Sequence, residues 1–252
     1  MIKKIRNSFV FRVGFFFKHL GRRKQLKNTI AEKLTLGEID SLELLNLCKE
    51  KGDVKTIYDI GANIGTWAVL AKSIFSSSDI QCFEPLEIHT EKFNQNTQNI
   101  KDIKLHPVAL GTSNSTEIIH ITSQSDSSSL LPITKKQTEV FGIEHKKDQL
   151  VSVVSLDSYV EENNLPRPDL MKLDIQGFEL EALKGASSCM KTCKFIILEI
   201  SFIEFYKNQP LFEEVVSFMF SKHFRIMSFG YNTATGIEIS QTDVLFRNTD
   251  LC

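Results

Sequence analysis

The sequence predicts an α/β fold, because short apolar runs alternate along most of the chain with stretches of helical periodicity. The run Thr56–Ile60 leads into a turn of small residues, after which apolar residues recur at helical spacing as far as Ile74. The run Phe195–Ile200 is apolar at almost every position, as expected of a strand that is covered on both faces. Together these observations place strands inside a sheet that is flanked by helices.

Length and composition are those of an ordinary globular protein. A chain of 252 residues can form one large domain, or one domain with an extension, and can bury a substantial core. No uninterrupted apolar run is long enough to span a bilayer. We therefore expect a main domain at residues 31–252, preceded by an extension at residues 1–30.

The extension differs from the main domain in charge. Residues 1–31 hold nine of the 30 basic residues and no acidic one, so the remainder carries 21 basic and 31 acidic side chains. A balance of −10 argues against a broad nucleic-acid-binding face on the main domain. Within the extension, apolar residues recur every three or four positions, which is typical of a helix on an anionic membrane surface. A helix whose phenylalanine face docks on the domain fits the same pattern, and both alternatives stay open.

The cysteines and histidines form no recognisable metal motif. The five cysteines are an odd number without a Cys-x-x-Cys pair, which favours a reducing compartment. We expect a cytoplasmic protein, which contacts the inner membrane face peripherally if the extension lies on a membrane and does not dock on the domain. Cys189 and Cys193 have helical spacing, but nothing completes a zinc set with them. No metal is expected, because none of five histidines has metal-ligand spacing to another: His89, His106, His120, His145 and His223.

The elements follow in a regular order that is broken once. A capping-box pattern at Thr35–Glu38 predicts a lead-in helix that ends near Gly52. Residues 113–155 interrupt the alternation and predict a hairpin-like insertion with a mobile loop. The predicted strands are 56–60, 80–83, 101–110, 117–121, 150–154, 169–175, 195–200, 224–229 and 243–246. One further helix is predicted to begin at residue 66, a second to end at about residue 97, and three more to lie at 156–161, 177–183 and 212–220.

The turn after the first strand has the composition of a cofactor-binding turn. Gly61 and Gly65 lack side chains that would block the approach of a ligand, and an asparagine such as Asn63 tolerates left-handed backbone angles. The turn lacks both the third glycine of a dinucleotide fingerprint and the lysine of a P-loop. Glu84 lies 19 residues after Gly65, at the next strand end, where a carboxylate can accept both hydroxyl hydrogens of a ribose. S-adenosylmethionine, which has a ribose and no phosphate, suits this combination.

A set of short motifs surrounds this turn between about residues 54 and 248. In order, they are Asp59-Ile60-Gly61-Ala62-Asn63-Ile64-Gly65, Phe83-Glu84-Pro85, Val108-Ala109-Leu110, Ser128-Ser129-Leu130, Ser155-Leu156-Asp157, Lys172-Leu173-Asp174-Ile175-Gln176-Gly177-Phe178-Glu179, Leu183-Lys184-Gly185-Ala186 and Leu198-Glu199. This ordered set resembles FkbM-type methyltransferases. A glycine-rich turn alone would be weak support for a family, whereas the ordered set is specific.

The resemblance implies a class I methyltransferase (Rossmann-like) fold, with a seven-stranded, mostly parallel sheet, helices on both faces and an antiparallel last strand. It also implies S-adenosylmethionine as the methyl donor and, commonly in this family, a hydroxyl oxygen as the acceptor. One departure concerns Gln176, where many members have glutamate. If that position supplied a base, this protein would lack it.

On the cofactor side, Glu84 is the expected ribose ligand, because an acid at a strand end has little structural purpose. Asp59 is expected either to anchor the turn or bind the methionine amino group, or else to cap the following helix. The candidate cofactor-binding residues are Asp59, Gly61, Asn63, Gly65, Glu84 and Ala109.

On the acceptor side, Asp174 is the candidate base, since a carboxylate at a strand end over the cofactor can take the proton of a hydroxyl acceptor. The alternative is that Asp174 caps the helix that opens near Gly177. Lys172 and Glu199 are further candidates on this side.

The expected function is therefore methyl transfer from S-adenosylmethionine to a hydroxyl of a glycan or a related polar compound. One alternative is an inactive methyltransferase-fold scaffold at a membrane, which the intact Gly61, Gly65, Glu84 and Asp174 disfavour. Another is methylation of protein or RNA, which the acidic main domain disfavours.

Overall fold

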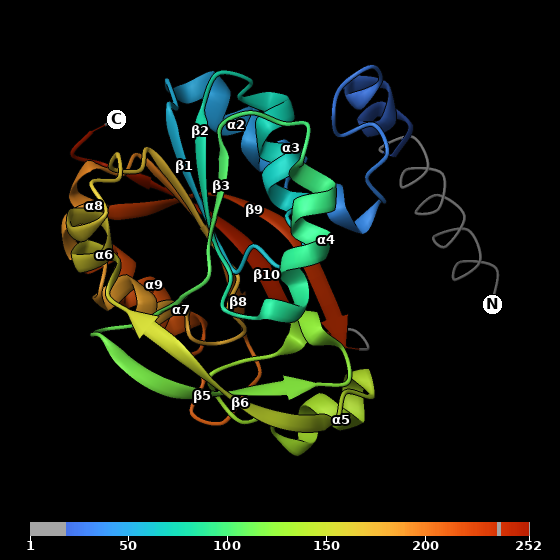
Figure 1. Cartoon of the computed structure of the whole chain (residues 1–252), viewed down its shortest axis with the longest axis vertical. Helices are drawn as coiled ribbons and strands as arrows, with labels where there is room; N and C mark the ends of the chain where they lie inside the picture. Colours follow the sequence, from blue (N-terminus) through green and yellow to red (C-terminus); the bar gives the residue numbers. More distant parts are fainter. Residues whose placement is uncertain (1–18, 236–237, 252) are drawn as a thin grey trace.

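The computed structural model describes residues 19–235 and 238–251. Within them, a large sheet runs through the molecule with helices on both faces, and a smaller sheet lies across one end (Figure 1). The large sheet has seven strands, in the order β3 (Ile103–His106), β2 (Asp79–Phe83), β1 (Thr56–Ile60), β7 (Leu170–Leu173), β8 (Phe195–Ser201), β10 (Glu238–Asn248) and β9 (Phe224–Thr235). Neighbours are parallel except at β10, which is antiparallel to β8 and β9. The predicted fold class is confirmed.

Helices cover both faces of the large sheet, which explains the apolar strands. Ile57 and Tyr58, adjacent in β1, are fully buried in two different hydrophobic clusters. Complete burial of such side chains contributes roughly 1.5–3 kcal/mol each. One cluster draws on α2 (Leu42–Lys51), α3 (Thr66–Ile74) and α4 (Glu87–Thr97), and the other on α6 (Leu156–Glu162), α7 (Glu179–Lys184), α8 (Ser187–Thr192) and α9 (Phe212–Ser221).

The second sheet belongs to the segment that interrupts the alternation. Its order is β4 (Ala109–Leu110), β6 (His145–Val154) and β5 (Ser115–Thr122), with β5 and β6 antiparallel. Between β5 and β6 lie a 3₁₀ turn, η2 (Ser125–Ser127), and a helix, α5 (Lys135–Phe141). A third, smaller hydrophobic cluster joins this sheet to the start of α4 through Leu86.

The prediction of one strand over residues 101–110 is wrong. Two strands occupy this stretch, β3 in the large sheet and β4 in the small one. Pro107 separates them, because proline has no N–H to donate to a ladder and turns the chain away from the sheet edge. The chain thereby passes from one sheet to the other, and Ala109 lies beside the cofactor turn.

Several predicted boundaries shift. The lead-in helix α2 begins at Leu42, after a 3₁₀ turn at Gly37–Ile39 (η1), although Glu38 accepts a hydrogen bond from the Thr35 N–H as the capping box predicts. Strand β7 ends at Leu173, so that Asp174 follows the strand. Strands β9 and β10 extend beyond their predicted ranges because each pairs along most of its length with the other.

The basic extension lies only partly within the described residues. The prediction of an amphipathic helix falls mainly on residues 1–18, which lie outside them, and the membrane contact stays a prediction. Residues 19–26 are helical, and Leu26 is 1% exposed. The Arg22 guanidinium binds Asp40 at 3.0 Å and Glu43 at 2.6 Å, so this basic residue is engaged by the domain. Of the helices that the structure describes, none has the length and apolar character needed to cross a bilayer.

Candidate active site

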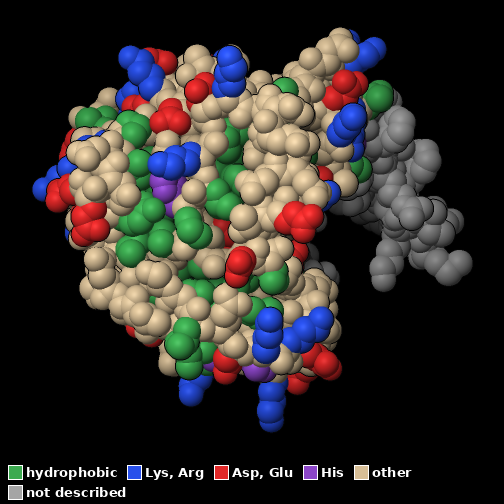
Figure 2. Space-filling model, in the orientation of Figure 1, with side chains coloured by type: hydrophobic (Ala, Val, Ile, Leu, Met, Phe, Trp, Pro, Cys, Tyr) green, Lys and Arg blue, Asp and Glu red, His purple; other side chains and the backbone are tan. Residues whose placement is uncertain are grey.

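A cavity of about 810 Å³ opens at the ends of β1, β2, β7 and β8. Its walls are the turn after β1, the residues that follow β2 and β7, and the segment 123–130 of the insertion. Open α/β sheets bind ligands at this edge, and the volume is typical of a small-molecule site. On the face shown in Figure 2, acidic and basic side chains are scattered over the surface, and neither kind forms a continuous patch.

The turn after β1 has the predicted left-handed geometry, with φ of 81° at Gly61, 48° at Asn63 and 79° at Gly65. The reason for the glycines differs from the expected one. A side chain at Gly61 would collide with the carbonyl oxygen of Asp174, and one at Gly65 would lie 2.9 Å from the Phe93 ring of α4. The glycines therefore allow the turn to pack against its protein neighbours, and this packing exposes the backbone to the cavity.

Glu84 holds the cofactor turn together. Its Oε2 accepts a hydrogen bond from the Asn63 N–H at 3.0 Å, and its Oε1 accepts one from the Leu86 N–H at 2.9 Å. The expectation that an acid here has little structural purpose is wrong. Each carboxylate oxygen has two lone pairs. His89 Nδ1 also lies 3.2 Å from Oε1, so Oε2 is the oxygen that keeps a lone pair for a ribose hydroxyl, and Glu84 lines the cavity.

Asp59 lies beneath the cavity and does not line it. Its side chain is completely buried, and the backbone N–H of Ala68, in the first turn of α3, contributes to lowering its pKa. Burial raises its pKa to about 6, against the opposing effect of the Lys172 ammonium, whose Nζ lies 3.8 Å from Asp59 Oδ1. The position suits an anchor below the turn and does not favour direct contact with a methionine amino group.

Three carboxylates from separate strands form a row on the side of the cavity that is built by β7, β8 and β10. Asp174 follows β7, Glu199 belongs to β8, and Asp243 is the direct cross-strand partner of Glu199 in β10. All three line the cavity, together with Lys172, whose ammonium lies 3.2 Å from Asp174 Oδ2. We call these four residues, which are three carboxylates and one ammonium, the carboxylate row. Asp243 was not predicted as a site residue. The sequence feature that could have indicated it is its position directly before the apolar run at 244–246.

The charged groups of the carboxylate row shift one another's pKa values. Burial, followed by the charge of Asp174, raises the pKa of Asp243 to about 7 and that of Glu199 well above its ordinary range. Burial alone would lower the pKa of Lys172, but the carboxylates of Asp174 and Asp59 raise it above its ordinary value. Lys172 therefore stays an ammonium, while Glu199 and Asp243 readily hold protons near neutral pH.

Gln176 joins the row through its side-chain amide. The amide nitrogen donates to Asp174 Oδ1 at 2.8 Å and to Glu199 Oε2 at 3.3 Å. The Tyr206 hydroxyl, in a fully buried side chain, donates to Gln176 Oε1 at 2.7 Å and so fixes which way the amide faces. Ser129 of the insertion donates to the Gln176 carbonyl oxygen at 2.7 Å. Tyr206 was not among the predicted site residues, because it lies in no motif.

Asp174 does not cap the helix that follows it. The N–H groups of Ile175 and Gly177 donate instead to Glu179 Oε1, at 2.8 and 3.2 Å. Helix α7 has no capping side chain at Phe178. The capping alternative for Asp174 is wrong, and its carboxylate faces the cavity side.

The structure thus brings most of the predicted site residues to one cavity. Those that line it are Gly61, Asn63, Glu84, Ala109, Lys172, Asp174 and Glu199. Asp59 and Gly65 support it from behind. Two further lining residues, Trp67 and His89, have buried ring nitrogens: His89 Nδ1 lies 3.2 Å from Glu84 Oε1, and Trp67 Nε1 has no hydrogen-bond partner among the described residues.

The parallel sheet with an antiparallel β10, the left-handed turn after β1 and the acid after β2 define a class I methyltransferase fold. The chain belongs to the FkbM family: the model of the Methyltransferase FkbM domain matches residues 59–226. S-adenosylmethionine is the cofactor of this domain class, and the site fits it, because Glu84 keeps a lone pair on Oε2 for a ribose beside the exposed turn.

Three known proteins illustrate the relationship. Hexuronic acid methyltransferase AglP of Haloferax volcanii is 29% identical over 164 residues, which are 65% of this chain and 62% of that protein. The match therefore spans less than two thirds of that relative. The 2-O-methyltransferase NoeI of Sinorhizobium fredii is 25% identical over 80% of this chain and 82% of its own length. The solved structure of magnesium protoporphyrin IX methyltransferase from Synechocystis superimposes with a TM-score of 0.49, at 10% identity, over 84% of this chain and 80% of that one.

Proposed function

We propose that this protein transfers the methyl group of S-adenosylmethionine to a hydroxyl oxygen of a sugar. The carboxylate row beside the cofactor turn is the observation that carries the proposal. Carboxylates accept hydrogen bonds from several hydroxyl groups at once, and a polyol presents such groups at close spacing. The names of AglP and NoeI support a sugar acceptor as well, since one names a hexuronic acid and the other a 2-O position.

When bound, S-adenosylmethionine supplies a methyl group on a positively charged sulfonium. The turn after β1 and Glu84 orient the ribose end, and this orientation supplies much of the acceleration of an in-line displacement. Lys172 holds Asp174 in place at 3.2 Å, and Gln176 fixes its other oxygen. The acidic surroundings also complement a cationic sulfonium.

Asp174 is the proposed base. As a bond forms between the acceptor oxygen and the methyl carbon and the bond between that carbon and sulfur breaks, Asp174 would take the proton of the acceptor hydroxyl, so that the products are a methyl ether and S-adenosylhomocysteine. The side chain of Asp174 is 36% exposed and lines the cavity, so a hydroxyl can reach it. Glu199 and Asp243, which hold protons more readily, are suited to donate hydrogen bonds to other oxygens of the acceptor.

The charge of the cavity narrows the acceptor class. Among the described lining residues there are seven carboxylates and a single ammonium, that of Lys172; the carboxylates belong to Glu38, Asp40, Glu84, Asp126, Asp174, Glu199 and Asp243. Even with protons on Glu199 and Asp243, five of these carboxylates face the one ammonium, and such a lining repels an anionic acceptor and accommodates a neutral or amino sugar. We therefore propose a neutral or amino sugar for this chain, in contrast to the hexuronic acid named for AglP.

The test is transfer of a labelled methyl group to matched acceptors. We expect product with neutral and amino sugars, free or in glycans, and at least tenfold less with the corresponding uronic acids. Peptide and RNA acceptors are included for the protein or RNA alternative. Labelling of RNA or peptide alone would contradict the proposal, as would a preference for uronic acids.

The scaffold alternative is tested separately by calorimetry with S-adenosylhomocysteine. A folded protein that binds no cofactor would support an inactive scaffold. We expect binding, because the turn and Glu84 are both in place.

A further inference from the structure

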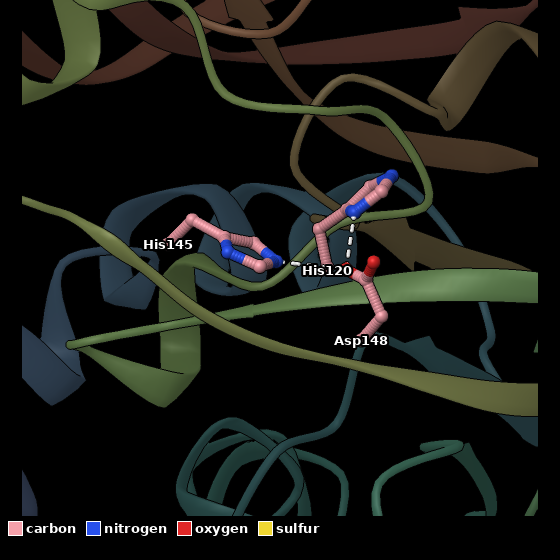
Figure 3. A group of neighbouring side chains, drawn as sticks. All are labelled: His120, His145 and Asp148. Atoms are coloured by element: carbon pink, nitrogen blue, oxygen red, sulfur yellow. Dashed lines mark hydrogen bonds and ion pairs between the residues drawn. The ribbon is translucent and has the colours of Figure 1, made fainter.

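Two histidines and an aspartate meet on the β5–β6 hairpin, away from the cavity (Figure 3). His120 belongs to β5, and His145 and Asp148 belong to β6. None of the three lines the cavity. In the sequence, no histidine has metal-ligand spacing to another, but the hairpin places His120 and His145 together. The sequence hides this group because its members come together only when the hairpin pairs.

A β-bulge brings the three side chains to one place. In the hairpin register, His120 pairs with Asp148, Ile121 with Lys147 and Thr122 with His145, so Lys146 is an extra residue without a partner. In a regular strand, residues three apart point to opposite faces. The bulge shifts this alternation by one residue and lets His145 turn toward Asp148.

The atoms of the three side chains that could bind a metal ion lie close together. His120 Nδ1 lies 2.8 Å from Asp148 Oδ1, and His145 Nε2 lies 2.7 Å from the same oxygen. The ligand atoms all lie within 4.8 Å of one another. Zinc holds nitrogen and oxygen ligands at about 2.0–2.2 Å, which places ligand atoms roughly 3–3.5 Å apart around one ion. A small outward rotation of the side chains is enough to admit an ion between them.

The kind of ligands indicates the kind of ion. Two imidazoles with one carboxylate suit zinc and its transition-metal neighbours, whereas magnesium and calcium prefer oxygen ligands alone. The side chains are 20%, 45% and 51% exposed for His120, His145 and Asp148, which leaves room for water to complete the coordination. Hydrogen bonds from His145 and His120 lower the pKa of Asp148, so the carboxylate is ionised at neutral pH.

We propose that His120, His145 and Asp148 bind one divalent transition-metal ion, of the zinc class, that clamps the loop end of the β5–β6 hairpin. The clamp lies next to a segment that lines the cavity. The backbone of His120 pairs in both directions with Ser129, and the Ser129 side chain donates to Gln176 of the carboxylate row network. A bound ion would therefore stabilise the insertion at the point where it meets the site.

The experiment uses the full chain without an affinity tag, freed of metal by a chelator and then titrated with Zn²⁺, Co²⁺ and Mg²⁺. We expect one Zn²⁺ or Co²⁺ per chain by calorimetry, a Co²⁺ absorption band and no saturable Mg²⁺ binding. Zn²⁺ should also raise the melting temperature, since a ligand that binds only the folded state stabilises it.

Two variants and one control locate the site. His145→Ala and Asp148→Asn should each weaken Zn²⁺ binding at least about tenfold and abolish the Zn²⁺-dependent rise in melting temperature. His223→Ala, which removes an exposed histidine next to Asp250, should change neither. Absence of Zn²⁺ binding to the original chain would overturn the proposal, and so would equal binding by the variants. Cofactor affinity is a separate readout, so failure here leaves the proposed methyl transfer standing.

Discussion

The two sides of the cavity are built in different ways. On the cofactor side, one continuous segment from β1 to α4 forms the turn. The shape of this side is set mainly by the backbone, through residues with left-handed angles and through N–H groups that donate to a single carboxylate. On the acceptor side, the row of carboxylates comes from β7, β8 and β10, which lie far apart in the sequence. The cofactor side is a local structure, and the acceptor side is assembled by the sheet.

This difference matches what each side is proposed to bind. All enzymes of the class bind one cofactor, which a short motif with defined backbone angles can serve. Acceptors differ between enzymes, and side chains at the ends of several strands can vary independently without disturbing the turn. Mutations should therefore separate the two sides: those in the row should change turnover, and those at Glu84 should change cofactor affinity.

The largest expected effect is on the acceptor side. Asp174→Asn should lower the single-turnover rate by about 10²–10⁴, the usual contribution of a positioned base, with cofactor affinity nearly unchanged. Rapid-quench and calorimetric measurements on the same sample test this. Asp126→Asn, at an exposed aspartate of the cavity wall, is the control. A full rate in Asp174→Asn would remove this residue from the chemistry and make Asp243 and Glu199 the next candidates.

On the cofactor side, Glu84→Gln should weaken binding of S-adenosylhomocysteine by about 1.5–3 kcal/mol, because it removes the charge that accepts the ribose hydroxyls. This corresponds to roughly 10- to 150-fold in affinity. Calorimetry measures the loss, and thermal unfolding shows whether the turn is intact without the full set of hydrogen bonds to Asn63 and Leu86. Glu87→Gln, at an exposed position nearby, should be neutral. Unchanged affinity in folded Glu84→Gln would disprove the assignment.

Tyr206→Phe tests whether the amide of Gln176 organises the row. Loss of the hydroxyl lets the amide turn, and its hydrogen bonds to Asp174 and Glu199 are weakened. One such hydrogen bond contributes about 0.5–1.5 kcal/mol, so turnover should fall roughly 2- to 12-fold. The cofactor affinity should not change, which distinguishes positioning from general destabilisation. A parallel loss of affinity would contradict the separation of the two sides.

The smallest expected effect is on stability and concerns pH. Asp243 has a pKa of about 7 in the folded protein, above the ordinary 3.8, so the folded state binds more protons than the unfolded state between these values. Stability of the cofactor-free protein should therefore fall as pH rises from about 4 to 7. Asp243→Asn should flatten this fall and raise the melting temperature at pH 8 by a few degrees, since about 1 kcal/mol corresponds to roughly 2–4 °C in a domain of this size. An identical pH dependence in Asp243→Asn and the original chain would contradict the burial of this charge.

Much of the fold follows from patterns within short segments. The apolar runs at β1 and β8, the helical spacing after the turn and the acid at the end of β2 are local, and the structure places each element close to its predicted range. Errors arose where pairing between segments decides the result. Pro107 divides a run that looks continuous, and β9 and β10 lengthen by pairing with each other.

The sequence by itself determined the fold class, the turn after the first strand and the cavity-lining residues Glu84, Lys172, Asp174 and Glu199, because each of these residues lies inside a motif at the end of a strand. Only the tertiary structure placed Asp243 opposite Glu199, brought Tyr206 to Gln176 and joined His120 to His145. It also changed the role of the glycines from ligand contact to packing against Asp174 and Phe93. The physical reason is the same in each case: backbone angles and periodicity depend on neighbours in the chain, whereas contacts between side chains depend on which strands pair and in which register.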